Sequence, residues 1–202
     1  MNCPSCNKPM ANFISLSDCG CVDLQLCREC HASKIANLTA SNTAILHKKL
    51  KEMSVPQRYW GASPDVSMWA KPNVSAVCSF KTGVYFFGDS GMGKTYQMIG
   101  WLKYAILHGI KVNYINWSDF TCTLKSDLKI YDKLKANTLT APVVFIDDFQ
   151  VGNAYIEDYT FNFINTIYNE GITPFLTSIN LPPHDRFAMR LGEMTVQYEV
   201  RN

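Results

Sequence analysis

The chain has 202 residues and a formal net charge of +2, with 47% apolar and 18% charged residues. This composition supplies a packed core and excludes global disorder, and the near balance of charge gives no argument for nucleic-acid binding from bulk charge. No apolar run approaches the roughly 18 residues of a membrane helix, and the N-terminus is polar and bears cysteines, unlike a signal peptide. We expect a soluble cytosolic protein of one domain with a small appendage and no membrane partner.

The first 30 residues contain six of the eight cysteines. In a reducing compartment, clustered cysteines indicate a metal site rather than disulfides. Cys3 and Cys6 form one Cys-x-x-Cys pair, and Cys27 and Cys30 form a second. Two such pairs at this separation are a tetrahedral zinc signature, so these four cysteines are the candidate Zn²⁺ ligands.

A second ligand set remains open at this stage. The segments 13–17 and 22–26 are predicted to be hairpin strands around Cys19 and Cys21. This hairpin followed by a helix resembles a treble-clef finger, in which the tip lies about 15 Å from the metal, at roughly 3.3 Å per strand residue. The geometry favours the pair at 27 and 30 over the pair at 19 and 21.

Residues 32–54 are predicted to be one helix. Apolar residues recur there at spacings of three, four and seven, as one buried stripe requires: Ile35, Leu38, Ile45, Leu46, Leu50 and Met53. Pro56, Gly61 and Pro64 then mark a boundary. We therefore divide the chain into an N-terminal zinc-binding unit with its helix, residues 1–54, and a larger domain, residues 55–202.

The larger domain alternates between apolar strands and helices. Strands are expected at 84–87, 112–117, 143–146, 174–179 and 195–200, and helices at 93–108, 118–137 and 156–169. Such alternation is typical of an α/β fold with a mainly parallel sheet flanked by helices, here of five strands.

The sequence GDSGMGKT follows the first of these strands and opens a helix, which is the context of a phosphate-binding loop. Its glycines allow positive φ, and its backbone N–H groups with the helix dipole can cradle phosphate oxygens. The candidate nucleotide-binding residues are Gly88, Asp89, Ser90, Gly91, Met92, Gly93, Lys94 and Thr95. Lys94 would reach the β- and γ-phosphates, and the Thr95 hydroxyl would ligate Mg²⁺.

The sequence VVFIDDF places two carboxylates after a buried strand, at the edge where α/β sheets bind ligands. Asp147 is the expected acid on the Mg²⁺ side, and Asp148 is the expected base that polarises the attacking water. The next strand, in FLTSIN, ends in polar residues, one of which would be placed to report on the γ-phosphate; the alternative is a plain Ser/Asn turn before Pro182 and Pro183. Arg186 and Arg190, four residues apart, would share a helix face, where the residues alone favour a solvated or ion-paired role.

The order of these motifs resembles that of DnaC/DnaI-type helicase loaders, which are AAA+ P-loop ATPases related to the initiator DnaA and the transposition helper IstB. The resemblance covers about residues 55–200 and is carried by PQRY, GDSGMGKT, VVFIDDF, FINTIYNEG, PFLTSIN and DRFAMRLGE. More loosely, the cysteine-bearing segment resembles the zinc-containing N-terminal domain of some DnaI-like loaders.

The resemblance implies roles by position. Lys94 and Thr95 would bind phosphate and Mg²⁺, Asp147 and Asp148 would be the acidic pair, Asn180 the sensor and Arg190 the arginine finger. The chain departs from the family where Ser178-Ile179-Asn180 replaces the usual Thr-Ser-Asn, which leaves the identity of the sensor open. The sequence after the fifth strand is too short for a full AAA+ lid, so we expect the lid to be reduced or absent.

The implied function is an ATP-dependent helicase loader in DNA replication, with ATP, Mg²⁺ and Zn²⁺ as cofactors. Its implied partners are a hexameric replicative helicase, single-stranded DNA and other copies of the chain in a spiral or ring. The short length fits a phage or mobile-element module in the bacterial cytosol. The alternative is an IstB-like transposition helper. A small-molecule kinase would need a substrate lid with several arginines, and residues 118–140 contain none. The intact P-loop and acidic pair oppose a zinc module with a degenerate ATPase.

Overall fold

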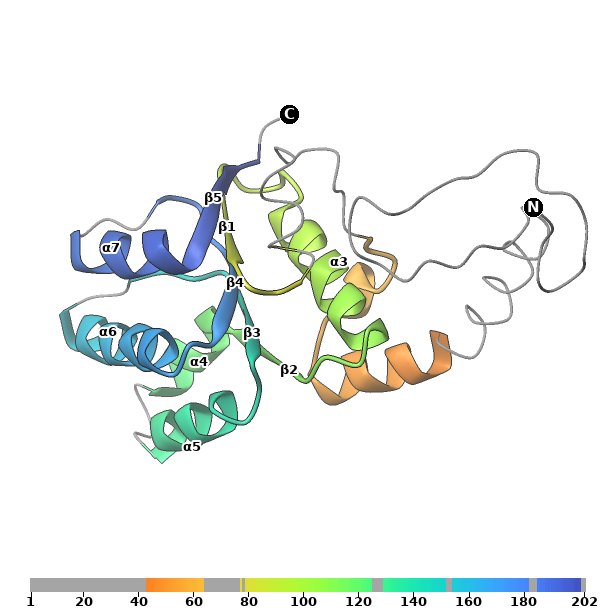
Figure 1. The fold of residues 1–202 in the computed structure, drawn as a ribbon, viewed down its shortest axis with the longest axis horizontal. Coiled ribbons are helices and arrows are strands. Elements are labelled where there is room, and N and C mark those ends of the chain that lie inside the picture. Colours follow the sequence, from red (N-terminus) through yellow and green to blue (C-terminus); the bar gives the residue numbers. More distant parts are fainter. Residues whose placement is uncertain are drawn as a thin grey trace, which may run out of the picture.

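The fold is known from a computed structural model that describes residues 43–63, 77, 79–124, 129–151, 154–181 and 185–200. A central sheet lies between two layers of helices, with α3 on one face and α4, α5, α6 and α7 on the other (Figure 1). No helix in these ranges is both long and apolar enough to cross a bilayer. The four candidate zinc ligands and the expected hairpin lie outside the described residues.

The sheet has five strands in the order β2-β3-β4-β1-β5, and every neighbouring pair is parallel. The strands are β1 (Gly83–Phe87), β2 (Val112–Asn116), β3 (Val143–Asp147), β4 (Thr173–Thr177) and β5 (Thr195–Glu199). The predicted α/β fold and its five strands are confirmed, each boundary to within two residues. Because all strands run the same way, the segments that follow β1, β3 and β4 meet at one edge of the sheet.

The helices of the larger domain are α3 (Lys94–Leu107), α4 (Trp117–Leu124), α5 (Lys129–Thr138), α6 (Ala154–Asn169) and α7 (Asp185–Met194). The single helical stretch expected at 118–137 is two helices, α4 and α5, and residues 125–128 between them are outside the description. Arg186 and Arg190 both lie in α7, about one helical turn apart.

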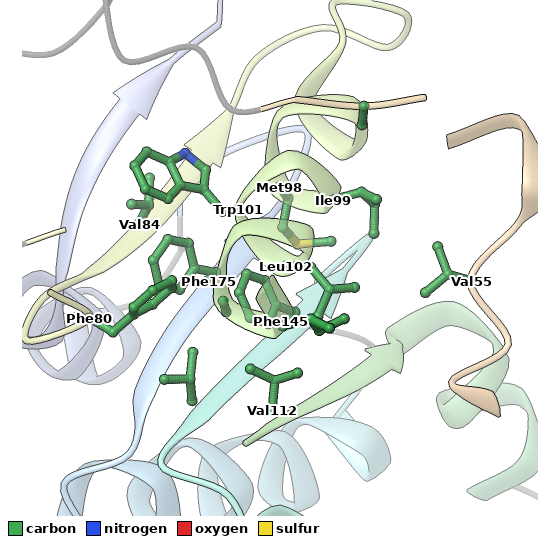
Figure 2. Close-up of a cluster of buried hydrophobic side chains, with 14 of the residues drawn as sticks. Val55, Phe80, Val84, Met98, Ile99, Trp101, Leu102, Val112, Phe145 and Phe175 are labelled. Atoms are coloured by element: carbon green, nitrogen blue, oxygen red, sulfur yellow. The ribbon is translucent and has the colours of Figure 1, made fainter. Parts of the chain in front are cut away.

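Side chains alternate between the two faces of the strands. Val84 and Phe86 of β1 belong to the core beneath α3, whereas Tyr85 between them belongs to the opposite core. The core beneath α3 is drawn in Figure 2, where Trp101, Met98 and Leu102 of α3 lie over the sheet. Burial on both faces explains why the inner strands β1, β3 and β4 contain continuous apolar runs, whereas polar residues interrupt the edge strands β2 and β5.

The described part of the N-terminal helix, residues 43–52, packs on the larger domain. Leu46 and Leu50 are buried in the core that contains α3, and the segment lies beside α3 in Figure 1. A short 3₁₀ helix, η2 (Gln57–Tyr59), follows and also contacts α3. Lys103 of α3 donates hydrogen bonds to the carbonyls of Trp60 and Ala62. Residues 43–52 therefore share a core with α3, the helix that carries Thr95 of the P-loop. The division of the chain at residue 54 stays a prediction.

Candidate nucleotide-binding site

The loop between β1 and α3 has the backbone of a phosphate cradle. Gly88, Gly91 and Gly93 have φ of 134°, 84° and 85°, a region that side chains disfavour. At Gly88 a Cβ would lie 2.6 Å from the carbonyl oxygen of Val200, so only glycine fits between β1 and the end of β5. Gly93 directly precedes α3, whose first N–H groups and dipole face the loop.

Lys94 is folded back over the loop. Its Nζ donates hydrogen bonds of 2.7 Å to the carbonyls of Gly88 and Asp89. Burial lowers the pKa of Lys94, and the nearby carboxylates of Asp89, Asp148 and Asp147 oppose that shift. The lysine thus places a cation inside the loop, where the phosphates of a nucleotide would replace the carbonyls as its partners.

Asp147, at the end of β3, accepts hydrogen bonds from three hydroxyl groups. Thr95 and Thr177 donate to its Oδ1 at 2.8 and 2.6 Å, and Tyr114 of β2 donates to its Oδ2 at 3.2 Å. Burial, followed by the charge of Asp147, raises the pKa of Tyr114, so its phenol remains a donor. The Thr95 hydroxyl and the Asp147 carboxylate are the oxygen donors that Mg²⁺ prefers, so this pair fits the expected metal.

Asp148 follows with φ of 57°, in the left-handed region. Its N–H donates to Thr177 Oγ1 at 2.8 Å, and Ser118, at the start of α4, donates to its Oδ2 at 2.5 Å. A longer contact of 3.4 Å joins its Oδ1 to the amide of Gln150. The two acids therefore point differently, Asp147 toward Thr95 and Asp148 toward α4.

The segment after β4 lies beside the P-loop. The carbonyl of Ile179 accepts from the N–H of Gly88 at 3.1 Å, and the carbonyl of Asn180 accepts from the Tyr85 hydroxyl at 2.9 Å. Burial raises the pKa of Tyr85 to about 12, so the phenol remains protonated. A cavity of about 440 Å³ is lined by Phe87, Gly88, Asp89, Met92, Ile179, Asn180, Leu181, Glu199 and Val200. Asn180 therefore lines a cavity that opens on the P-loop.

The two arginines of α7 have different surroundings. Arg186 forms a 2.6 Å ion pair with Glu157 of α6 and lies over the ring of Phe161. The guanidinium of Arg190 lies 4.3 Å from the ring centre of Tyr168, and its buried Nε has no hydrogen-bond partner among the described residues.

Tyr168 also shows where Arg190 lies relative to the P-loop. It is the second-to-last residue of α6, which ends at Asn169, just before β4 begins. Arg190 therefore lies toward the amino ends of the strands, opposite the edge that carries the P-loop and the acids.

The sequence reasoning brought together Lys94, Thr95, Asp147 and Asp148 but missed three hydroxyls that hold the acids: Tyr114, Ser118 and Thr177. Asp147 ends β3, and the parallel register that pairs Ile146 with Leu176 brings Thr177 alongside it. A polar residue that ends an apolar strand was the available signal for Thr177. Nothing in the local sequence distinguishes Tyr114 or Ser118.

Comparison with known proteins agrees with this geometry. The family described as "Bacterial DnaA ATPAse domain" matches residues 59–193. The fold is similar to that of DnaI, with a TM-score of 0.58, 17% identity and coverage of 73% of this chain and 92% of DnaI. It is also similar to the DnaC helicase loader, with a TM-score of 0.56, 20% identity and coverage of 72% and 100%.

A further similar structure is the replication initiator DnaA bound to AMPPCP and single-stranded DNA, with a TM-score of 0.53 and 22% identity; the match covers 63% of this chain and 43% of DnaA. No curated protein matches the sequence significantly. At these identities the structural matches show a shared AAA+ fold.

Proposed function

The chain belongs to the family of bacterial DnaA ATPase domains, and from that premise we propose that it is an ATP-dependent helicase loader of DNA replication. One observation carries the nucleotide part of this proposal: Thr95 and Asp147 lie in hydrogen-bond contact at the mouth of a glycine loop that holds Lys94. The loader part is supported by the match to DnaC and DnaI, which covers those chains almost entirely.

ATP would bind with its phosphates in the loop that starts at Gly88. The backbone N–H groups and the ammonium of Lys94 would then bind the β- and γ-phosphates. Mg²⁺ at Thr95 and Asp147 would neutralise charge on the same oxygens. Together these residues would hold the γ-phosphate at the edge of the sheet that carries the acids.

Asp148 is the proposed general base. It would take a proton from a water as the water oxygen attacks the γ-phosphorus and the bond to the β,γ-bridging oxygen breaks, yielding ADP and phosphate. Ser118 and Thr177 hold the side chain and the backbone of Asp148 before the nucleotide arrives. Asn180 is the proposed sensor of the γ-phosphate, because it lines the cavity beside the loop.

Arg190 is the proposed arginine finger, and its position supports action on a neighbouring copy. It lies toward the amino ends of the strands, stacked on Tyr168, whereas the P-loop and the acids lie at the carboxyl ends. A head-to-tail arrangement of copies would bring it to the next chain's γ-phosphate, where a cation stabilises developing charge. Such an arrangement is the basis for the proposed ATP-dependent assembly into a spiral or ring.

The N-terminal residues 1–54 are proposed to hold Zn²⁺ through Cys3, Cys6, Cys27 and Cys30 and to bind the helicase. Its helix is anchored on α3 through Leu46 and Leu50, which would link partner binding to the P-loop helix. We expect about one Zn²⁺ per chain, lost in Cys3→Ser or Cys30→Ser and kept in Cys19→Ser. Metal retention by the first two variants would contradict this ligand set.

The loader role is tested by capture of partners from a bacterial lysate with the full chain and ATP. A hexameric replicative helicase should be retained, and Lys94→Ala should retain less of it if assembly needs ATP. Single-stranded DNA should bind the ATP-bound oligomer along its inner face. Recovery of a transposase with duplex DNA instead of the helicase would favour the IstB-like alternative and overturn the loader proposal.

A further inference from the structure

Thr177, the last residue of β4, contacts three consecutive residues of the acidic segment. Its Oγ1 lies 2.6 Å from Asp147 Oδ1 and 2.8 Å from Asp148 N, and its carbonyl oxygen accepts the N–H of Phe149 at 2.7 Å. The side chain is only 2% exposed, so water does not supply alternative partners. One buried residue therefore holds the backbone and one side chain of the whole turn.

The proton on the Thr177 hydroxyl has a defined direction. A hydroxyl has one proton and two lone pairs, and a backbone N–H can only donate. Thr177 Oγ1 must therefore accept from Asp148 N, and its single proton is left for Asp147 Oδ1. The hydroxyl couples the orientation of the Asp147 carboxylate to the backbone position of Asp148.

The backbone of Asp148 needs such support. Its φ of 57° is unfavourable for a residue with a side chain. Phe149, the residue after Asp148, is buried in the core on the face of the sheet covered by α4–α7, which fixes that end of the turn. The hydrogen bond to Thr177 fixes it from the adjacent strand. Together these contacts orient the Asp148 carboxylate so that its Oδ2 accepts the hydrogen bond from Ser118.

We propose that Thr177 is a positioning residue for hydrolysis. Its hydroxyl fixes the orientation of Asp147, the acid on the Mg²⁺ side, relative to Asp148, the base. The inference rests on the proposed ATPase function and assigns a specific role to β4. Catalysis depends on such geometry, because a misplacement of about 1 Å can lower the rate about a hundredfold. ATP binding does not depend on it to the same degree, because Lys94 and the loop amides do not contact Thr177.

The test uses Thr177→Val, which keeps the shape and removes the hydroxyl, and Thr177→Ser, which keeps the hydroxyl. Thr160→Val is the matched control, because Thr160 is fully buried in α6 and its hydroxyl donates to the carbonyl of Ile156 in the same helix at 2.9 Å. In the full-length protein we expect Thr177→Val to lower kcat by about tenfold to a hundredfold with KM for ATP nearly unchanged. Thr177→Ser and Thr160→Val should stay within about threefold of the wild type.

The Mg²⁺ concentration at half-maximal ATPase should also rise in Thr177→Val alone, because Asp147 loses a donor that orients it. A second readout needs no activity: hydrogen exchange at the amides of Asp148 and Phe149 should be faster in Thr177→Val than in the wild type and Thr160→Val. Should Thr177→Val fail to fold, Thr177→Ala takes its place in both measurements.

Wild-type kcat and wild-type exchange in Thr177→Val would overturn the proposal, and so would equal losses in Thr177→Val and Thr160→Val. If the wild-type protein hydrolyses no ATP either alone or when assembled, the proposed ATPase function is wrong. In that case the exchange rates at Asp148 and Phe149 still decide whether Thr177 holds the turn.

Discussion

The P-loop edge of the sheet and helix α7 both present a cation, and the two cations differ in how they are held. Lys94 is bound by two carbonyls of its own loop, close to both acids. Arg190 stacks on Tyr168 toward the opposite end of the sheet, and its buried Nε has no hydrogen-bond partner in the part of the chain that the structure describes. The first region forms a phosphate cradle within one chain, whereas Arg190 lies toward the other end of the sheet from the P-loop of its own chain. The difference suggests that binding is a property of the monomer and hydrolysis a property of the assembly.

The largest effect is expected at Lys94. Lys94→Ala removes the cation from the loop, so ATP affinity should fall by roughly a hundredfold or more, because charge-assisted contacts to phosphate are lost. Titration with a fluorescent ATP analogue measures this. Lys111→Ala, at an exposed lysine just before β2, is the control and should bind normally. Normal ATP affinity in Lys94→Ala would contradict the assignment of this loop as the phosphate-binding site.

Asp148→Asn separates binding from chemistry at the same edge. ATP affinity should stay within about threefold of the wild type, while kcat should fall by about a hundredfold or more, since a neutral amide cannot take the proton of the attacking water. Steady-state ATPase assays at saturating ATP measure this, with Asp132→Asn on the exposed side of α5 as the control. Unchanged kcat in Asp148→Asn would mean that the base is misassigned.

The two arginines of α7 give the sharpest contrast between structure and catalysis. Arg190→Ala should lower the ATPase rate of the assembled protein by about a hundredfold or more and leave ATP binding to the monomer intact. Arg186→Ala should instead lower stability by about 1 kcal/mol, because its pairing with Glu157 is partly exposed. ATPase assays and urea unfolding of both variants measure this. Equal ATPase losses in the two variants would assign Arg190 a structural role.

The smallest expected effect concerns pH. Burial lowers the pKa of Lys94, and Asp89 is the strongest of the charges that oppose this shift. The protonated lysine binds phosphate, so ATP affinity should be constant at lower pH and fall as pH rises through the lowered pKa. Asp89→Asn removes a raising charge and should move that fall to lower pH by less than about one unit. Affinity measured from pH 7 to 10 checks this, and a shift to higher pH would contradict it.

The sequence allowed the P-loop and the acids to be predicted because both are continuous motifs at the ends of apolar runs. The strands could be found for the same reason, since burial on both faces leaves runs such as 143–146 without polar interruption. The sequence predicted one helical stretch at 118–137 because the pattern is helical both in 118–124 and in 129–137, where the structure has α4 and α5.

The hydroxyls around the acids could not be predicted in the same way. Tyr114, Ser118 and Thr177 come from three segments, and only the register of β2, β3 and β4 brings them to Asp147 and Asp148. The orientation of Arg190 depends likewise on how α7 packs against α6. The sequence resemblance implied that Arg190 is an arginine finger. Only the fold could show that Arg190 lies away from the P-loop of its own chain.

The central claim, that ATP bound by one chain is hydrolysed with Arg190 of another, is tested most directly by mixing two inactive variants. Lys94→Ala retains Arg190, and Arg190→Ala retains the P-loop lysine. In an equal mixture that assembles at random, about a quarter of the interfaces pair both intact groups, so about a quarter of the wild-type ATPase rate should return. No recovery, in mixed oligomers shown to form by differential labelling, would contradict a finger acting between chains.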